Sequence, residues 1–137
     1  MPNVEQPGAD DNGSGVAVAL GTIALLSKIK LKKTVRIIFW DFEEFGFLGA
    51  RAYVQKNLKK LKNETLLGYV NLEMLGHDSK RTDKKNRQGN MKIYIRKISE
   101  KGYRDDLFFA QRLSNFGKRI TKTVRFEITA NSFNSSD

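Results

Sequence analysis

The chain has 137 residues, of which 39% are hydrophobic and 29% charged; its formal net charge is +10 and it contains no cysteine. This length and apolar content suit one modest core, and the lack of cysteine excludes a disulfide framework and a thiolate metal site. No apolar run reaches the roughly 20 residues that a membrane-spanning helix needs, and residues 1–13 are too polar for a secretory signal peptide. We therefore expect a folded chain without a membrane partner.

The positive charge is spread over separate Lys- and Arg-rich runs, at residues 28–33, 56–62, 80–87, 96–104 and 118–125. Such runs could contact phosphate backbones. They lack interleaved aromatic residues and match no nucleic-acid-binding motif, so a solvated surface is the preferred interpretation and no nucleic-acid partner is expected.

The first half of the chain alternates helical and strand patterns after a polar, turn-rich start. Apolar residues at helical spacing predict an amphipathic helix over residues 14–28. Residues 34–42 are β-branched, aromatic and almost continuously apolar, which predicts a strand buried on both faces. Gly46 and Gly49 interrupt this pattern before a helix over 50–61. Residues 66–75 predict a second buried strand.

The second half begins with a polar, Lys-rich loop over residues 78–90. A third strand is predicted over 91–98, a helix over 105–118 and a fourth strand over 123–129. This order of elements predicts an α/β fold with a mostly parallel or mixed central sheet and helices on both faces. There is no internal repeat and no second domain.

Acidic residues follow both predicted buried strands. Glu43 and Glu44 come directly after residues 34–42, Glu73 lies near the end of residues 66–75, and the acidic stretch GADDNGSG begins at Gly8. In an open α/β sheet, ligands bind at the carboxyl ends of the strands. If the strands are parallel, carboxylates from three elements meet at one rim.

Carboxylates crowded in a partly dry site repel one another unless a cation neutralises them. A divalent metal explains the cluster, and oxygen ligands suit zinc, manganese or magnesium. The adjacent Glu43 and Glu44 point in different directions in extended backbone, so one can bind metal while the other accepts a proton from water. This division of roles is typical of metal-assisted hydrolysis.

Each acid also has a simpler interpretation. Asp10 and Asp11 precede a helix, where acids commonly cap the N-terminus. Glu43 and Glu44 could be helix-start or exposed turn residues. Glu73 in an apolar strand is harder to explain, because a buried unpaired carboxylate is costly.

Three stretches taken together resemble a known family. PGADDNGSGVAVAL, VRIIFWDFEEFGFLGARAYV and LLGYVNLEMLGH are similar, in order and spacing, to the core motifs of zinc aminopeptidases of the bacterial leucine-aminopeptidase type. That family includes glutamate carboxypeptidase II and, more distantly, glutaminyl cyclase. The resemblance covers residues 7–77 strongly and implies a co-catalytic site in which two zinc ions lie about 3.5–4 Å apart.

The resemblance also implies a role for each acid. Asp10 would bridge both zinc ions, Glu44 would bind one zinc, and Glu43 would act as the general base. Glu73 takes the place of the other zinc's ligand, where the family usually has Asp. Asp11 and Asn12 match the turn that begins the helix behind the site.

The family site also requires two histidines, one in an upstream His-x-Asp motif and one after a late Ser-Asp dipeptide. The single histidine here, His77, is not at a ligand position, and Asp137 ends the chain where the second would follow. We therefore expect a partial catalytic domain that is incomplete at both ends, binds zinc weakly and has low or no peptidase activity. Uncovered sheet edges would favour a homo-oligomer.

The resemblance implies an exopeptidase that acts on a peptide substrate, most simply an aminopeptidase. A carboxypeptidase or glutaminyl-cyclase relative, a catalytically silent module like the transferrin receptor, and a basic nucleic-acid binder stay as alternatives. Family members are commonly exported, and without an export signal in these residues the localisation stays open.

Overall fold

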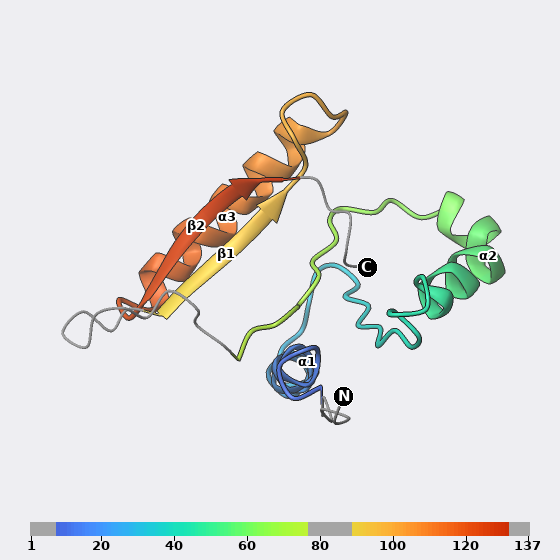
Figure 1. The fold of residues 1–137 in the computed structure, drawn as a ribbon, viewed down its shortest axis with the longest axis horizontal. Coiled ribbons are helices and arrows are strands. Elements are labelled where there is room, and N and C mark those ends of the chain that lie inside the picture. Colours follow the sequence, from blue (N-terminus) through green and yellow to red (C-terminus); the bar gives the residue numbers. More distant parts are fainter. Residues whose placement is uncertain (1–7, 77–88, 132–137) are drawn as a thin grey trace, which may run out of the picture. The chain divides into compact units, whose positions relative to one another are not determined.

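The computed structural model describes residues 8–76 and 89–131, which belong to two compact units of an α/β chain (Figure 1). The first unit comprises residues 8–76 and contains two helices. The second comprises residues 89–131 and contains two strands and one helix.

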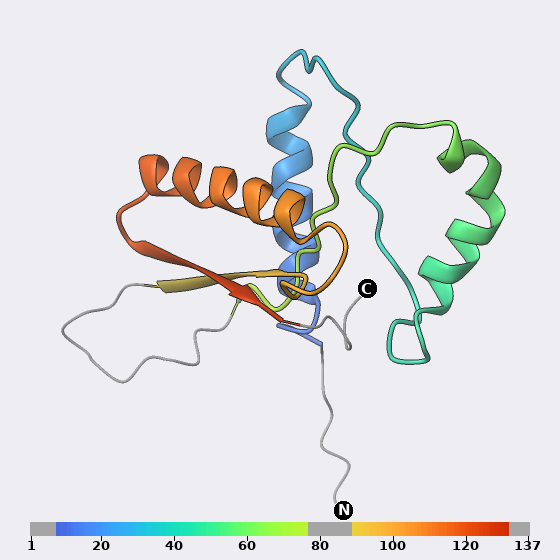
Figure 2. The same ribbon diagram turned by 90° about the horizontal axis from the view of Figure 1, so that it is seen from above.

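The second unit is a β-α-β arrangement. Strand β1 (Gly89–Ile95) is followed by helix α3 (Tyr103–Ile120) and strand β2 (Val124–Ala130). The strands pair in parallel, with Gly89 opposite Val124 and Ile95 opposite Ala130. Helix α3 lies along the pair and contacts both strands (Figures 1 and 2). The predicted strands at 91–98 and 123–129 and the helix at 105–118 are confirmed, with β1 ending at Ile95, and the parallel pairing agrees with the mostly parallel or mixed sheet that was predicted.

Small residues on α3 form the tight part of this unit. Ala110 and Ser114 are 1% and 3% exposed and lie four residues apart, on one face of the helix. A side chain at Gly117, further along the helix, would collide with the ring of Phe126 on β2. Together with Ile95, which is 4% exposed, these residues allow the helix backbone to approach the strands closely.

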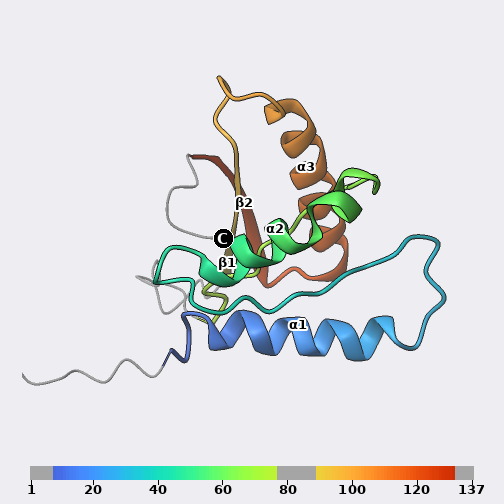
Figure 3. The same cartoon turned by 90° about the vertical axis from the view of Figure 1, so that its right-hand side faces the viewer.

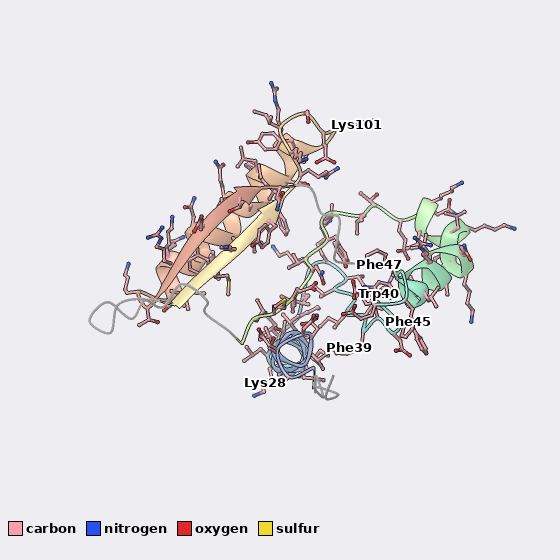
Figure 4. The ribbon with its side chains drawn as sticks, viewed as in Figure 1. Lys28, Phe39, Trp40, Phe45, Phe47 and Lys101 are labelled. Carbon is pink, nitrogen blue, oxygen red and sulfur yellow. The ribbon has the colours of Figure 1, made fainter. Side chains whose placement is uncertain are left out.

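A bidentate ion pair connects the end of β1 to the first turn of α3. The guanidinium of Arg96 donates from Nη2 to Asp106 Oδ1 at 2.5 Å and from Nε to Oδ2 at 2.6 Å. Its Nη1 donates to the carbonyl of Lys101 in the intervening loop (Figure 4). The hydrogen bonds from Arg96 lower the pKa of Asp106 below its ordinary value.

The first unit contains helices α1 (Gly13–Leu26) and α2 (Leu48–Lys62), which confirm the helices predicted over 14–28 and 50–61. Helix α1 runs without interruption (Figure 3) and buries Gly15 and Ala19. Lysines in the last turn of α2 face the negative end of its dipole. Among the described helices, none combines the length and apolar character needed to cross a bilayer.

The strands predicted over residues 34–42 and 66–75 are wrong for this structure. Neither segment is a strand, and both expose the apolar side chains expected to be buried: Phe39 is 49% exposed and Leu66 80%. A strand exists only when a neighbouring backbone completes its hydrogen bonds. Within the part of the chain that the structure describes, neither segment has such a neighbour.

Side chains tie residues 34–42 to α2 instead. Arg36 Nη2 lies 2.9 Å from Oε1 of Glu64, just after the helix, and this hydrogen bond lowers the pKa of Glu64. Trp40 meets Tyr53 of α2 edge to face, with ring centroids 5.3 Å apart. The segment is therefore held by isolated contacts, whereas a sheet would hold it by a continuous ladder.

Candidate functional site

The turn before α1 is joined to residues 72–76 by hydrogen bonds that span 60 to 66 positions of sequence. Asp10 Oδ1 accepts from the backbone N–H of Gly76 at 2.7 Å. Asn12 Nδ2 donates to the carbonyl of Leu72 at 2.8 Å. Ser14 Oγ accepts from the N–H of Leu75 at 2.8 Å. The first and third of the sequence motifs therefore lie against each other.

Glycine makes this contact possible. Gly15 is buried, and a Cβ at that position would collide with the Leu72 carbonyl and with Oδ1 of Asn12. A Cβ at Gly76 would lie 2.9 Å from Asp10 Oδ1. Close backbone approach, which needs a residue without a side chain, is thus observed at Gly15.

The second motif forms a tight turn that leads into α2. The carbonyl of Glu43 accepts from the N–H groups of Gly46 and Phe47, both at 2.9 Å. Gly49 donates its N–H to the Asp41 carbonyl at 3.0 Å. The turn presents Glu44 to solvent and leaves Glu43 half-buried, so the two neighbouring residues differ in exposure, although their backbone is a turn and not the extended backbone that the sequence suggested.

Left-handed backbone lies beside the candidate acids. Phe42 has φ of 55°, Phe47 of 61° and Met74 of 46°. A bulky residue with positive φ is uncommon and costs about 1–3 kcal/mol, so such residues persist where the surroundings impose them. Two of the three flank Glu43 and Glu44, and the third follows Glu73. Trp40, Phe45 and Phe47 lie around the turn into α2 (Figure 4).

The structure brings some predicted site residues together. Asp10 and Asn12 contact the segment that carries Glu73, and Glu73 itself is half-buried, with Oε2 accepting from Asn71 Nδ2 at 2.9 Å. No three acidic or histidine side chains of residues 8–76 and 89–131 are grouped closely enough to hold a metal ion. The metal-ligand roles of Asp10, Glu44 and Glu73 therefore stay predictions. Asp137 and His77 lie outside the described residues.

Sequence reasoning missed two residues of this region. Ser14 was expected only as part of a helix start, yet its Oγ both donates to the Asp10 carbonyl at 2.7 Å and accepts from Leu75. The bond to Asp10, four residues away, is a local pattern that the sequence could suggest. The positive φ of Met74 has no sequence signal.

The donor chemistry fits a divalent cation, because all candidate ligands are carboxylate oxygens. Oδ1 of Asp10 already accepts a backbone N–H, which orients the carboxylate and is compatible with a ligand role for its second oxygen. The described residues thus supply suitable oxygens but not an assembled set of three.

The family model of peptidase family M28 matches residues 2–137. The chain belongs to peptidase family M28. Members of this family are generally metal dependent, with zinc as the metal, so the predicted resemblance to zinc aminopeptidases is confirmed at the level of the family.

Individual relatives of this M28 chain align over about half of it. A probable lipoprotein aminopeptidase of Mycobacterium tuberculosis is 44% identical over 73 residues, which are 52% of this chain and 14% of the relative. An aminopeptidase of Pseudomonas aeruginosa is 40% identical over 72 residues, 53% of this chain and 13% of the relative. Leupeptin-inactivating enzyme 1 of Streptomyces exfoliatus is 38% identical over 71 residues, 50% of this chain and 16% of the relative.

The M28 chain therefore spans well under two thirds of the length of these relatives. No solved structure matches it significantly.

Proposed function

We propose that this chain is the catalytic core segment of a metal-dependent exopeptidase that removes amino-terminal residues from peptides through a two-zinc site. The observation that carries the proposal is the hydrogen-bonded joint between residues 10–14 and 72–76. It supports a common site because it places the acidic turn of the first motif against the segment that carries Glu73.

The proposal gives each acid one role. Asp10, Glu44 and Glu73 hold the metal, which when bound polarises the scissile carbonyl and lowers the pKa of water. Glu43 takes a proton from the attacking water and returns it to the leaving amine. The half-buried position of Glu43, beside the exposed Glu44, supports this separation of roles.

The 137-residue chain by itself should bind zinc weakly and hydrolyse peptides slowly or not at all. Its candidate ligands, Asp10, Glu44 and Glu73, are all carboxylates, which favour harder cations than zinc. Cation binding is therefore measured on this chain, and hydrolysis on the longest natural polypeptide that contains it.

The experiment that tests the proposal replaces Glu43 with Gln. We expect Glu43→Gln to keep cation binding and to lower kcat on amino-acid amides by about 10²–10⁴-fold, because a general base is lost without a ligand. Glu100→Gln is the matched control, since Glu100 is exposed in the second unit, outside the three motifs, and Gln can keep its bond to the Lys97 N–H; it should leave both quantities unchanged. Unaltered hydrolysis by Glu43→Gln would contradict the assigned base.

A second comparison separates Asp10 from Asp11. Asp10 uses Oδ1 to hold Gly76, whereas Asp11 is exposed in the same turn. If Asp10 is the ligand, Asp10→Asn weakens cation binding more than Asp11→Asn. The reverse order would assign the ligand oxygen to Asp11 and leave Asp10 as the residue that holds the turn.

The remaining alternatives differ in substrate and in assembly. Hydrolysis of amino-acid amides would indicate a peptidase, whereas cyclisation of peptides that begin with Gln would indicate a cyclase. A chain that binds no cation would be a catalytically silent module.

We also propose a homo-oligomer through the outer edges of β1 and β2, whose described neighbours are only each other. Sedimentation of the chain tests this assembly, and a monomer would contradict it.

A further inference from the structure

The joint between residues 10–14 and 72–76 has more hydrogen bonds than capping α1 requires. Capping needs a side-chain oxygen at Asn12 to accept from an N–H in the first turn, and Oδ1 does so from Gly15 at 3.2 Å. Asn12 uses its amide nitrogen for something else: Nδ2 donates to Leu72 at 2.8 Å. The same Oδ1 also lies 3.4 Å from the N–H of Met74.

Ser14 has a similar double connection. Its hydroxyl donates to the Asp10 carbonyl within the turn and accepts from the N–H of Leu75 on the other segment. Since a hydroxyl carries one donor and two acceptor sites, both bonds form together. Ser14 thereby links the backbone of the residue that carries one candidate ligand to a position two residues after Glu73.

The contact is also sterically exclusive. Gly15 approaches the Leu72 carbonyl so closely that no side chain fits between them. Residues 72–76 form no strand, and the left-handed Met74 interrupts any regular continuation. Residues 72–76 are therefore fixed by the hydrogen bonds from the turn, in place of the backbone ladder that would fix a strand.

We propose that Asn12 and Ser14 are positioning residues, which clamp the turn carrying Asp10 and Asp11 to the segment carrying Glu73 and so set the spacing between the candidate metal-binding carboxylates. The inference rests on the proposed function. It assigns to these two side chains the task of keeping acids from distant parts of the sequence within reach of one cation. Groups that orient metal ligands typically contribute 10–100-fold to metal affinity.

The test separates the clamp from the helix cap. Asn12→Ser retains a good capping oxygen but is too short to reach Leu72, and it adds no charge that could itself attract a cation. Ser14→Ala removes the bond to Leu75. Thr22→Ala is the matched control, because the Thr22 hydroxyl lies on the same helix and bonds only within it, to Val18.

Two properties are measured on the 137-residue chain. Hydrogen exchange at the amides of Leu75 and Gly76 reports whether the clamp is closed, and Mn²⁺ titration followed by electron paramagnetic resonance reports whether the acids are held for a cation. We expect Asn12→Ser and Ser14→Ala to lose amide protection and to weaken Mn²⁺ binding about 10–100-fold with α1 helicity kept. Thr22→Ala should match the unmodified chain.

Gly15→Ala provides a further variant that changes no hydrogen-bonding side chain. Its Cβ would force Leu72 away, so it should give the same loss of protection and of Mn²⁺ affinity. Agreement among the three variants supports the clamp as the shared cause.

Other results overturn the inference in distinguishable ways. Retained protection in Asn12→Ser and Ser14→Ala would show that no clamp exists. Lost protection with unchanged Mn²⁺ affinity would make the clamp structural only. If the unmodified chain binds no Mn²⁺, the proposed function fails and the positioning role fails with it.

Discussion

Each of the two units is stabilised internally by a different kind of contact. Residues 89–131 are fixed by a parallel ladder and by a helix whose small face packs on it, with Ile95 and Ala110 almost fully buried. Residues 8–76 have two helices that do not contact each other, and the contacts between distant segments of this unit include side-chain hydrogen bonds, such as those of Asn12 and Ser14.

This difference indicates where stability and function are concentrated. Burial in the second unit supplies non-directional stabilisation that depends on volume. Hydrogen bonds in the first unit supply direction and spacing but little net stabilisation each, about 0.5–1.5 kcal/mol. The candidate acids lie in the unit that is organised for spacing, and we expect that unit to open more readily.

The largest expected effect comes from truncating the core of the second unit. Ile95→Ala removes a side chain that is 4% exposed and should lower the free energy of opening of the sheet by about 2–5 kcal/mol. Hydrogen exchange at the β2 amides measures it. Ile98→Ala is the matched control, since Ile98 is 79% exposed, and should change the same quantity by less than about 0.5 kcal/mol. Equal losses would contradict a core centred on Ile95.

A smaller effect is expected from adding one methyl group to α3. Gly117→Ala gains helix propensity of up to about 1 kcal/mol. The new Cβ, however, would collide with the Phe126 ring, and overpacking of this kind costs about 1–3 kcal/mol. We therefore expect net destabilisation, measured by exchange at the amides of α3 and β2.

The same substitution in the first unit should have the opposite sign. A Cβ at Gly21 of α1 would meet nothing within 4 Å. Gly21→Ala should therefore stabilise α1 by up to about 1 kcal/mol. If Gly117→Ala and Gly21→Ala both stabilise the protein, α3 does not pack closely on β2. If both destabilise it, α1 is covered along the face that carries Gly21.

The sequence predicted each helix of the described residues and the paired strands, because these elements depend on local pattern. Helix α3 has acidic residues in its first turn, basic residues in its last and apolar residues at helical spacing, all readable without a structure. Residues 34–42 and 66–75 have equally strong strand patterns but form no strand here, because a ladder requires a partner that composition cannot supply.

The candidate site shows the same limit. Motif order predicted that residues 10–14 and the segment of Glu73 belong together, and Asp10 does contact Gly76. The partners themselves were not predictable, since a Ser14 hydroxyl bonded to a backbone N–H 61 positions away leaves no trace in residue type or spacing.

The smallest expected effect is that of low pH on two ion pairs, one in each unit. Asp106 accepts three hydrogen bonds from Arg96, including one from its backbone N–H, whereas Glu64 accepts one from Arg36. Both carboxyl groups have a lowered pKa, with the hydrogen bond from the arginine as the main cause. A lowered pKa means that the stabilising contribution is complete above the ordinary value, about 3.9 for Asp, and is lost as the pH falls through the folded value.

Acidification below about pH 4 should therefore lower the hydrogen-exchange protection factors, which correct for the intrinsic pH dependence of amide exchange, more around residues 96–106 than around Arg36 and Glu64. Both pairs are substantially exposed, with side-chain exposures of 43% and 25% for Arg96 and Asp106, so solvent screening should keep the change within about fivefold. Asp106→Asn should remove this pH dependence in the second unit, and Glu64→Gln should leave it there unchanged. A larger loss of protection at low pH around Glu64 would mean that the Arg36–Glu64 pair stabilises its unit more than the Arg96–Asp106 pair does. That result would contradict the contrast between a packed second unit and a first unit organised for spacing.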